Sequence, residues 1–353
     1  MKRFAVLFAV LALVLPAIAQ EPPAIREQLD VNVVLLDAIV TDAKGNQILG
    51  LTKDDFVVKE NGVEQTIDSI DYFTNRQLLS QREENAPFKV EQVREERYFI
   101  FFFDKPTDPG VLADQLHLAR NATRKFVREE LKEGDRVAIV GHDVRLKVYS
   151  DFTSDRQQLE RALNDATRFG RGVTKPAANA VETSILRNVD ATDMMNRTGT
   201  VYQALDILAD AVRPIRARKN LVMFSPGVIE QNEDVRGGMI FNRSRHLDPA
   251  LESLNAANVT VYPMQLQREV SLDPVFHQRL EEFATSTGGQ YFRFNTNFET
   301  PLDRVDDVNA GYYLLTYRTR ANERGHGFRR VEVSVKGQPQ LRVTSRSGYG
   351  FDS

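Results

Sequence analysis

The sequence predicts an α/β protein with a doubly wound, mostly parallel sheet inserted in, or flanked by, a small antiparallel β-sandwich. Between residues 98 and 308, apolar segments rich in Val, Ile and Phe alternate with segments of helical period. Parallel strands require crossover connections, so this alternation indicates a parallel sheet with helices on both faces. Before residue 75 and after residue 309, strand patterns occur without helices. We therefore expect the two ends of the chain to build the antiparallel part.

Length and charge restrict the function classes. A chain of 353 residues is long enough for about two domains, each with its own core. Its formal net charge of -3 provides no broad basic field, which argues against a nucleic-acid partner. It has no cysteine, so a zinc-thiolate cluster, a thiol nucleophile and disulfide bonds are excluded.

Residues 1–19 have the pattern of a secretory signal. Lys2 and Arg3 precede an apolar run from Phe4 to Leu15, and small residues follow up to Ala19. A short apolar helix behind positive charge engages the export machinery, and small residues fit the signal peptidase. The alternative is an uncleaved anchor, although the run is shorter than the ~20 residues of a bilayer span. We expect cleavage near Ala19 and a secreted or periplasmic protein.

Residues 20–75 are expected to form a β unit. The run DVNVVLLDAIVT from residue 30 reads as a strand, and Asn61-Gly62 lies between FVVKE and VEQTI. Asn-Gly is a strong signal for a two-residue hairpin, because both turn positions need positive φ. The charged segment 76–97 that follows reads as a solvated linker.

The α/β domain is predicted over residues 98–308. YFIFFFD is a continuous apolar run, typical of a strand buried on both faces. A helical repeat from Leu112 to Val127 follows it, and Ser154 is a candidate N-cap for the next helix. Further strands are predicted for RVAIVGH, NLVMFSPG, VTVYPMQL and QYFRF, and further helices for TVYQALDILADAVRPI, LDPALESLNAAN and FHQRLEEFATSTGG.

Residues 309–353 are predicted to be three strands, GYYLLTYRTR, FRRVEVSVKG and LRVTSRSGYGF. Three strands without helices cannot complete the α/β layer, so we expect them to pair with the unit of residues 20–75. The alternative is two separate small β pieces.

The order FIFFFD, GDRVAIV, GTVYQALDILAD, NLVMFSPG and VTVYPM resembles a von Willebrand factor type A domain, a Rossmann-like fold. With the flanks DFVVKENGVEQTIDSI and SRSGYGF, nearly all of the mature chain resembles the acidobacterial VWFA-related family of exported proteins. The resemblance implies a non-enzymatic binding or adhesion module.

The resemblance also implies where a divalent ion would bind. Type A domains often hold one between a D-x-S-x-S loop, a threonine and an aspartate in a third loop. Here Asp104 and Thr200 match, but Pro106 and Asp108 replace the two serines and Pro226 replaces the aspartate.

Two alternatives follow for this loop. In the first, Asp104, Asp108 and Thr200 bind Mg²⁺ with Thr107 or Ser225 as helper hydroxyls. In the second the metal site is degenerate: Asp104 accepts hydrogen bonds from the turn or caps a helix near residues 110–113, and Lys105 neutralises the carboxylates.

The sequence motifs give little indication of an enzyme. The five histidines lack metal-ligand spacing, and only His142 is placed at a strand end where a hydrolase site would lie. We expect no catalytic residue, no cofactor and no small-molecule substrate. The predicted partner is a protein or envelope component.

This partner is expected at the carboxyl edge of the sheet. The predicted edge comprises the 104–110 loop with Asp104, Thr107 and Asp108, the 168–199 insertion, Thr200, and the 225–238 turn with Ser225.

Overall fold

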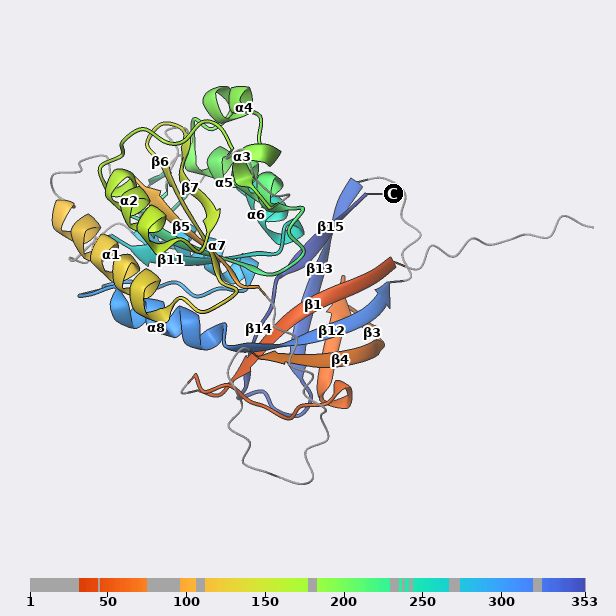
Figure 1. Ribbon diagram of the computed structural model, residues 1–353. Coiled ribbons are helices and arrows are strands. Elements are labelled where there is room, and N and C mark those ends of the chain that lie inside the picture. The colour runs from red at the N-terminus through yellow and green to blue at the C-terminus, as the bar shows by residue number, and fades with distance from the viewer. Residues whose placement is uncertain are drawn as a thin grey trace, which may run out of the picture. The chain divides into compact units, whose positions relative to one another are not determined.

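A five-stranded sheet forms the centre of the α/β domain in the computed structural model (Figure 1). Its strands are β5 (Tyr98–Asp104), β6 (Arg136–His142), β7 (Leu146–Thr153), β8 (Lys219–Ser225) and β11 (Val259–Gln265), in the order β11-β8-β5-β6-β7. All neighbours are parallel except β6 and β7. This is the strand order of a doubly wound sheet. The chain adds strands on one side of β5 first and then on the other, so the winding direction reverses between β5 and β8. The predicted fold class is confirmed.

The structure describes residues 32–43, 45–74, 96–105, 112–176, 183–228, 235–236, 239–240, 244–266, 274–319 and 326–352. The predicted signal segment and most of the predicted linker lie outside these ranges. No helix among the described residues is both long enough and apolar enough to cross a bilayer.

Strand β5 is buried on both faces, as its continuous apolar run predicts. Phe99, Phe101 and Phe103 pack into one core. Ile100 and Phe102 pack into the other. The alternation follows from the two-residue period of a strand, and it requires helices on both sides.

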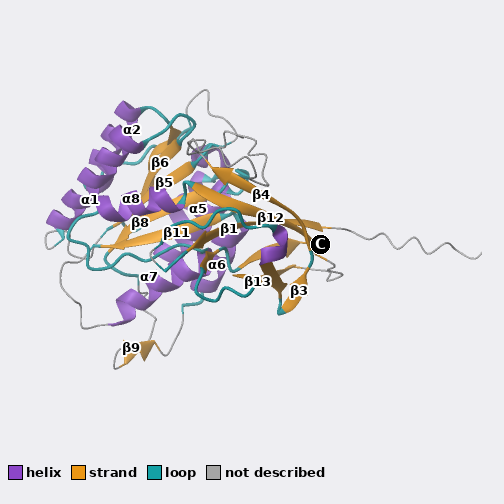
Figure 2. Ribbon diagram, turned by 90° about the horizontal axis from the view of Figure 1, so that it is seen from below, coloured by secondary structure: helices purple, strands orange, loops and turns teal. Residues whose placement is uncertain are grey.

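Helices cover both faces of this sheet (Figures 1 and 2). The core around Phe99 contains apolar residues of α1, α2 and α8, and the core around Ile100 contains residues of α3, α5, α6 and α7. The helices are α1 (Ala113–Lys125), continued by a π-helical turn (Phe126–Glu130), α2 (Arg156–Thr167), α3 (Ile185–Asn188), α4 (Ala191–Asn196), α5 (Val201–Val212), α6 (Leu247–Ala256), α7 (Pro274–Thr287) and α8 (Glu299–Val308).

The ends of the chain form the two sheets of the sandwich. Their orders are β14-β1-β12-β4 and β15-β13-β2-β3. The strands are β1 (Asn32–Thr41), β2 (Phe56–Glu60), β3 (Val63–Gln65), β4 (Ile67–Thr74), β12 (Gly311–Thr319), β13 (His326–Val335), β14 (Arg342–Thr344) and β15 (Gly348–Asp352); a 3-10 turn, Lys53–Asp55, precedes β2, and β9 (Val235–Arg236) and β10 (Met239–Ile240) form a separate two-stranded ribbon. The α/β domain is inserted between β4 and β12.

The Asn61-Gly62 hairpin is confirmed. Asn61 has a φ of 48° and Gly62 a φ of 81°, and they join the antiparallel strands β2 and β3. Both values are the positive angles that a type I′ turn needs.

Three local predictions were wrong. The N-cap of α2 is Asp155, which accepts hydrogen bonds from two backbone amides, and not Ser154. The predicted strand QYFRF contributes one bridge, from Phe292 to Met264, because the chain turns away at Phe294 with a φ of 56°. The last predicted strand is two, β14 and β15, because the chain crosses from one sheet of the sandwich to the other between them.

The buried Lys219, the first residue of β8, should make the stability of the protein depend on pH. Its side chain is fully buried, and Nζ donates a hydrogen bond to the carbonyl of Ile215. Burial lowers the pKa of Lys219 to about 7; Asp37 opposes this shift and Arg346 adds to it. Above pH 7 the unfolded chain therefore binds more protons than the folded chain, and stability rises with pH.

We expect this lysine to add about 1 kcal/mol of unfolding free energy per pH unit between pH 7 and 9. Lys219→Met removes the unfavourable desolvation and should lose this dependence. Urea unfolding of both proteins at pH 7, 8 and 9 measures it. Parallel pH profiles for wild type and variant would contradict the assignment.

Candidate functional site

The carboxyl edge of the sheet carries Asp104, His142 and Ser225 among its polar residues. Asp104 ends β5, His142 ends β6 and Ser225 ends β8. The register pairs Asp104 with His142, and it pairs Phe103 with Phe224, the residue before Ser225. Because these strands are parallel, their last residues meet at one edge. Two of them, β5 and β8, flank the position where the winding direction reverses, which is where open α/β sheets bind ligands.

Ser225 and Asp104 are joined by a buried hydrogen bond. Ser225 Oγ donates to Asp104 Oδ2 over 2.7 Å, and the amide of Gly227 donates to Ser225 Oγ over 3.1 Å. Gly227 has a φ of 133°, a conformation that a residue with a Cβ rarely adopts. This backbone shape turns the chain after β8 back onto the serine.

Asp104 is 5% exposed, and its partner across the edge is His142. His142 Nδ1 lies 3.8 Å from Asp104 Oδ1. Burial raises the pKa of Asp104, and the interactions with His142 and Ser225 offset only part of that rise. The carboxyl group therefore keeps its proton to a higher pH than an exposed aspartate.

The roles expected for Asp104 and Lys105 at a degenerate site depend on the turn of residues 106–111, which lies outside the described residues, so they stay predictions. The described side-chain donor to Asp104 is not on α1, whose N-cap Leu112 makes no side-chain cap bond. The side-chain hydroxyl of Ser225, delivered by the neighbouring strand, is its donor. Lys105 Nζ instead lies 5.8 Å from the centre of the Phe169 ring.

The described parts of the 168–199 insertion contact this edge. The carbonyl of Thr198 lies 3.0 Å from His142 Nε2, and Thr198 Oγ1 accepts from the amide of Leu146. At the other end, Lys147 Nζ donates to the carbonyls of Phe169 and Gly170. The insertion is thus held at both ends on β6 and β7.

Thr200 is the N-cap of α5. Its hydroxyl accepts from the amide of Gln203, whose side-chain oxygen in turn lies within hydrogen-bond distance of the Thr200 amide and hydroxyl. This capping box explains why a threonine precedes the helix without reference to a metal.

Few ligands for a divalent ion are present among the described residues of the edge. No group of three or more His, Asp or Glu side chains suited to a metal occurs within the described ranges. Mg²⁺ needs six oxygen ligands, and Asp104 already pairs with Ser225 and faces His142. Thr107 and Asp108 of the predicted ligand set lie outside the described residues, so this ligand set stays a prediction.

The three residues do not have the arrangement of a hydrolase triad. In such a triad the imidazole stands between serine and carboxylate. Here the carboxyl group of Asp104 lies between the other two residues, and Ser225 Oγ donates a hydrogen bond to it. His142 Nε2 faces the carbonyl of Thr198, which can only accept, so this nitrogen carries the proton. The two imidazole nitrogens thus face Asp104 and Thr198.

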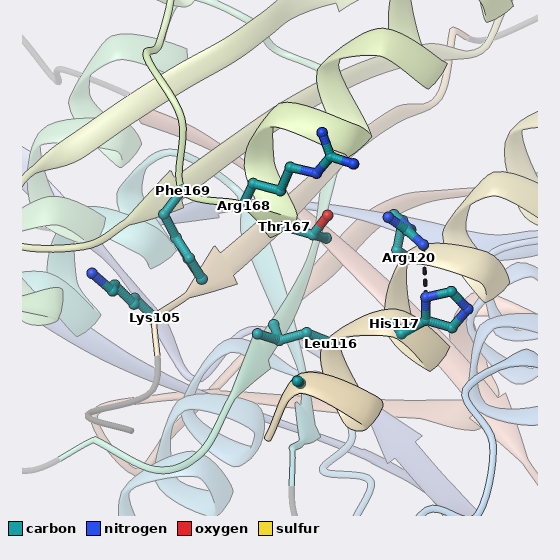
Figure 3. Close-up of a pocket in the computed structure, with 8 residues that line it drawn as sticks. Lys105, Leu116, His117, Arg120, Thr167, Arg168 and Phe169 are labelled. Carbon is teal, nitrogen blue, oxygen red and sulfur yellow. Dashed lines mark hydrogen bonds between the residues drawn. The ribbon is translucent and has the colours of Figure 1, made fainter. Parts of the chain in front are cut away.

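A pocket beside the edge was missed by sequence reasoning (Figure 3). It has a volume of about 460 Å³ and lies between the end of β5, helix α1 and the end of α2. Its lining residues are Lys105, Ala113, Leu116, His117, Arg120, Thr167, Arg168 and Phe169. The spacing of Ala113, Leu116, His117 and Arg120 on one helical face was a signal, but only the fold brings α2 against it.

Comparisons with known proteins found similarity to solved structures alone. No family model matches it, and no curated protein matches it. It is similar to a von Willebrand factor type A structure from Catenulispora acidiphila, with 10% identity, a TM-score of 0.42, and coverage of 84% of this chain and 73% of that one. It is also similar to the vWF domain of the type V pili tip protein Mfa5 from Porphyromonas gingivalis, with 9% identity, a TM-score of 0.40, and coverage of 62% and 97%.

A third similar structure is the conserved hypothetical protein BatB from Bacteroides thetaiotaomicron, with 12% identity, a TM-score of 0.37, and coverage of 60% and 97%. These likenesses concern the fold, whose assignment here rests on the strand order of the sheet. The type A domain that the sequence motifs resemble is thus also found among the similar solved structures.

Proposed function

We propose that this chain is an exported, non-enzymatic binding module that recognises a protein or envelope partner at the carboxyl edge of its α/β sheet. The observation that supports this most is the position of Asp104 and Ser225. They end the two adjacent strands between which the sheet reverses its winding direction.

The buried residues of the edge would organise the surface, and their exposed neighbours would contact the partner. Asp104, His142 and Ser225 are at most 8% exposed. Val144, in the turn between β6 and β7, is 71% exposed, and Arg145 beside it is also exposed. Loops held by a rigid sheet are frequent binding elements.

A charge reversal tests the location of the partner site. We expect Arg145→Glu to reduce retention of an envelope partner at least tenfold, because a like or unpaired charge at an interface costs more than 1.4 kcal/mol. The immobilised mature protein is incubated with a solubilised envelope fraction, and retained proteins are quantified by mass spectrometry.

Arg216→Glu is the matched control. Arg216 is exposed, and it precedes β8 at the opposite edge of the sheet. Retention should be unchanged by this variant. Equal loss in both variants, or no loss in Arg145→Glu, would refute recognition at the carboxyl edge.

The alternative is divalent-metal-dependent adhesion through Asp104, Asp108 and Thr200. Titration calorimetry with Mg²⁺ and Mn²⁺, on wild type and Asp104→Ala, separates the two forms of the proposal. Binding heat that disappears in Asp104→Ala, with partner retention lost in chelator, supports the metal-dependent form. If neither ion gives binding heat or raises the thermal stability, metal-dependent adhesion is refuted and the metal-independent proposal stands.

A further inference from the structure

The pocket between α1 and α2 has an unusual balance of charge. Lys105, Arg120 and Arg168 contribute three cationic side chains, and none of the described residues that line the pocket is acidic. The three cations belong to separate segments of the chain: Lys105 follows β5, Arg120 is on α1 and Arg168 follows α2. The fold therefore brings together positive charges that are distant in sequence.

Arg120 is the most constrained of these cations. One terminal nitrogen, Nη2, lies 2.7 Å from His117 Nδ1, as Figure 3 shows. A guanidinium can only donate, so this imidazole nitrogen accepts and His117 offers no negative charge in return. The Nε of Arg120 is buried without a hydrogen-bond partner. Burial lowers the pKa of Arg120, and repulsion from Arg124 and Arg168 lowers it further.

The lining also includes apolar side chains beside the polar Thr167 and His117. Leu116 of α1 and Phe169 after α2 contribute side chains to the pocket, and Lys105 lies beside the Phe169 ring. At about 460 Å³, the pocket has the size of a small-molecule site and is larger than a bare ion requires. Its chemistry thus combines cationic donors with one aliphatic and one aromatic surface.

We propose that this pocket binds a small organic oxyanion, a carboxylate or phosphate ester with an apolar part. The oxyanion would accept hydrogen bonds from Arg120 and Lys105, and the apolar part would contact Phe169 and Leu116. Charge-assisted hydrogen bonds to arginine are strong and directional, and a bound anion would offset the repulsion that Arg120 experiences from Arg168. The pocket shares Lys105, Arg168 and Phe169 with the predicted partner-binding edge, but its ligand is a small molecule, so its test needs only the purified protein.

The test uses four probes at constant ionic strength in chloride buffer: inorganic phosphate, phenyl phosphate, acetate and benzoate. Thermal denaturation and titration calorimetry measure the half-saturating concentration of each. We expect saturable binding of phenyl phosphate or benzoate, at least tenfold tighter than phosphate or acetate respectively, because only the aromatic probes contact Phe169. Whichever aromatic probe binds tighter identifies the anionic group.

Two variants localise the binding. Arg120→Met and Lys105→Met should each weaken it at least tenfold, and Arg120→Met should fold normally because it removes a cation that its neighbours repel. Arg216→Met, with the same change in net charge outside the pocket, should bind as wild type. No saturable binding of either aromatic probe, or equal weakening in Arg216→Met, overturns the proposal.

Discussion

Replacing Glu60 with alanine should lower the free energy of unfolding by about 3–5 kcal/mol, because it breaks the buried ion pair between Glu60 and Arg329. The Glu60 carboxylate accepts hydrogen bonds from Tyr317, Thr319, Arg329 and Tyr349 at 2.7–2.9 Å. These donors lie on β12, β13 and β15, and Glu60 itself ends β2, so one side chain connects the two sheets of the sandwich. Urea unfolding of the mature protein measures the loss.

A double variant tests the physical reason. Glu60→Leu combined with Arg329→Met removes both buried charges, so it should be more stable than Glu60→Ala. If the double variant is the less stable of the two, the broken ion pair with Arg329 is not the cause of the loss.

The stabilisation that Glu60 provides should decrease at low pH. Burial raises the pKa of Glu60, but the hydrogen bonds from Thr319, Tyr349, Tyr317 and Arg329 outweigh burial and leave the pKa below its usual value of 4.5. Its stabilising contribution is therefore present above pH 4.5 and is lost as the pH falls through the lower folded pKa.

Replacing Arg97 with methionine should cost a similar 3–5 kcal/mol. The guanidinium of Arg97 holds Asp135 with two hydrogen bonds of 2.8 and 2.6 Å, and it holds Asp306 with one of 2.6 Å. All three side chains are buried. Without Arg97, Asp135 loses its cation and Asp306 retains only Lys132, at 3.0 Å.

Arg136 is the matched control for Arg97. It pairs with Glu96 at 3.0 Å, and both side chains are more than 40% exposed. An exposed pair of this kind contributes less than about 1 kcal/mol, so Arg136→Met should be nearly neutral. Equal losses in Arg97→Met and Arg136→Met, measured by urea unfolding, would contradict the importance of burial.

At Arg97, the last residue of the predicted linker, the expectation of a solvated segment does not hold. The segment 76–97 was expected to be solvated, yet Arg97 is 9% exposed and contacts α8, the last helix before β12. A charge-dense sequence does not reveal that one of its arginines forms ion pairs with buried carboxylates. Those carboxylates, at positions 135 and 306, are distant in sequence.

The order of elements could be predicted from the sequence because it depends on local patterns. The buried run YFIFFFD needs no partner to be recognised as a strand with two covered faces, and Asn61-Gly62 specifies its turn through backbone angles alone. The same is true of the pairing of the chain ends, which follows from strands that have no helices to cover them.

The chemistry of the carboxyl edge was decided by tertiary structure. The sequence marks Asp104, Ser225 and His142 as strand ends, but only the strand order makes Ser225 the donor to Asp104 and places His142 beside it. The pocket around Arg120 depends in the same way on α1 and α2 meeting. Burial, hydrogen bonding and charge repulsion act over a few ångströms in space, so they are determined by which distant segments the fold brings together.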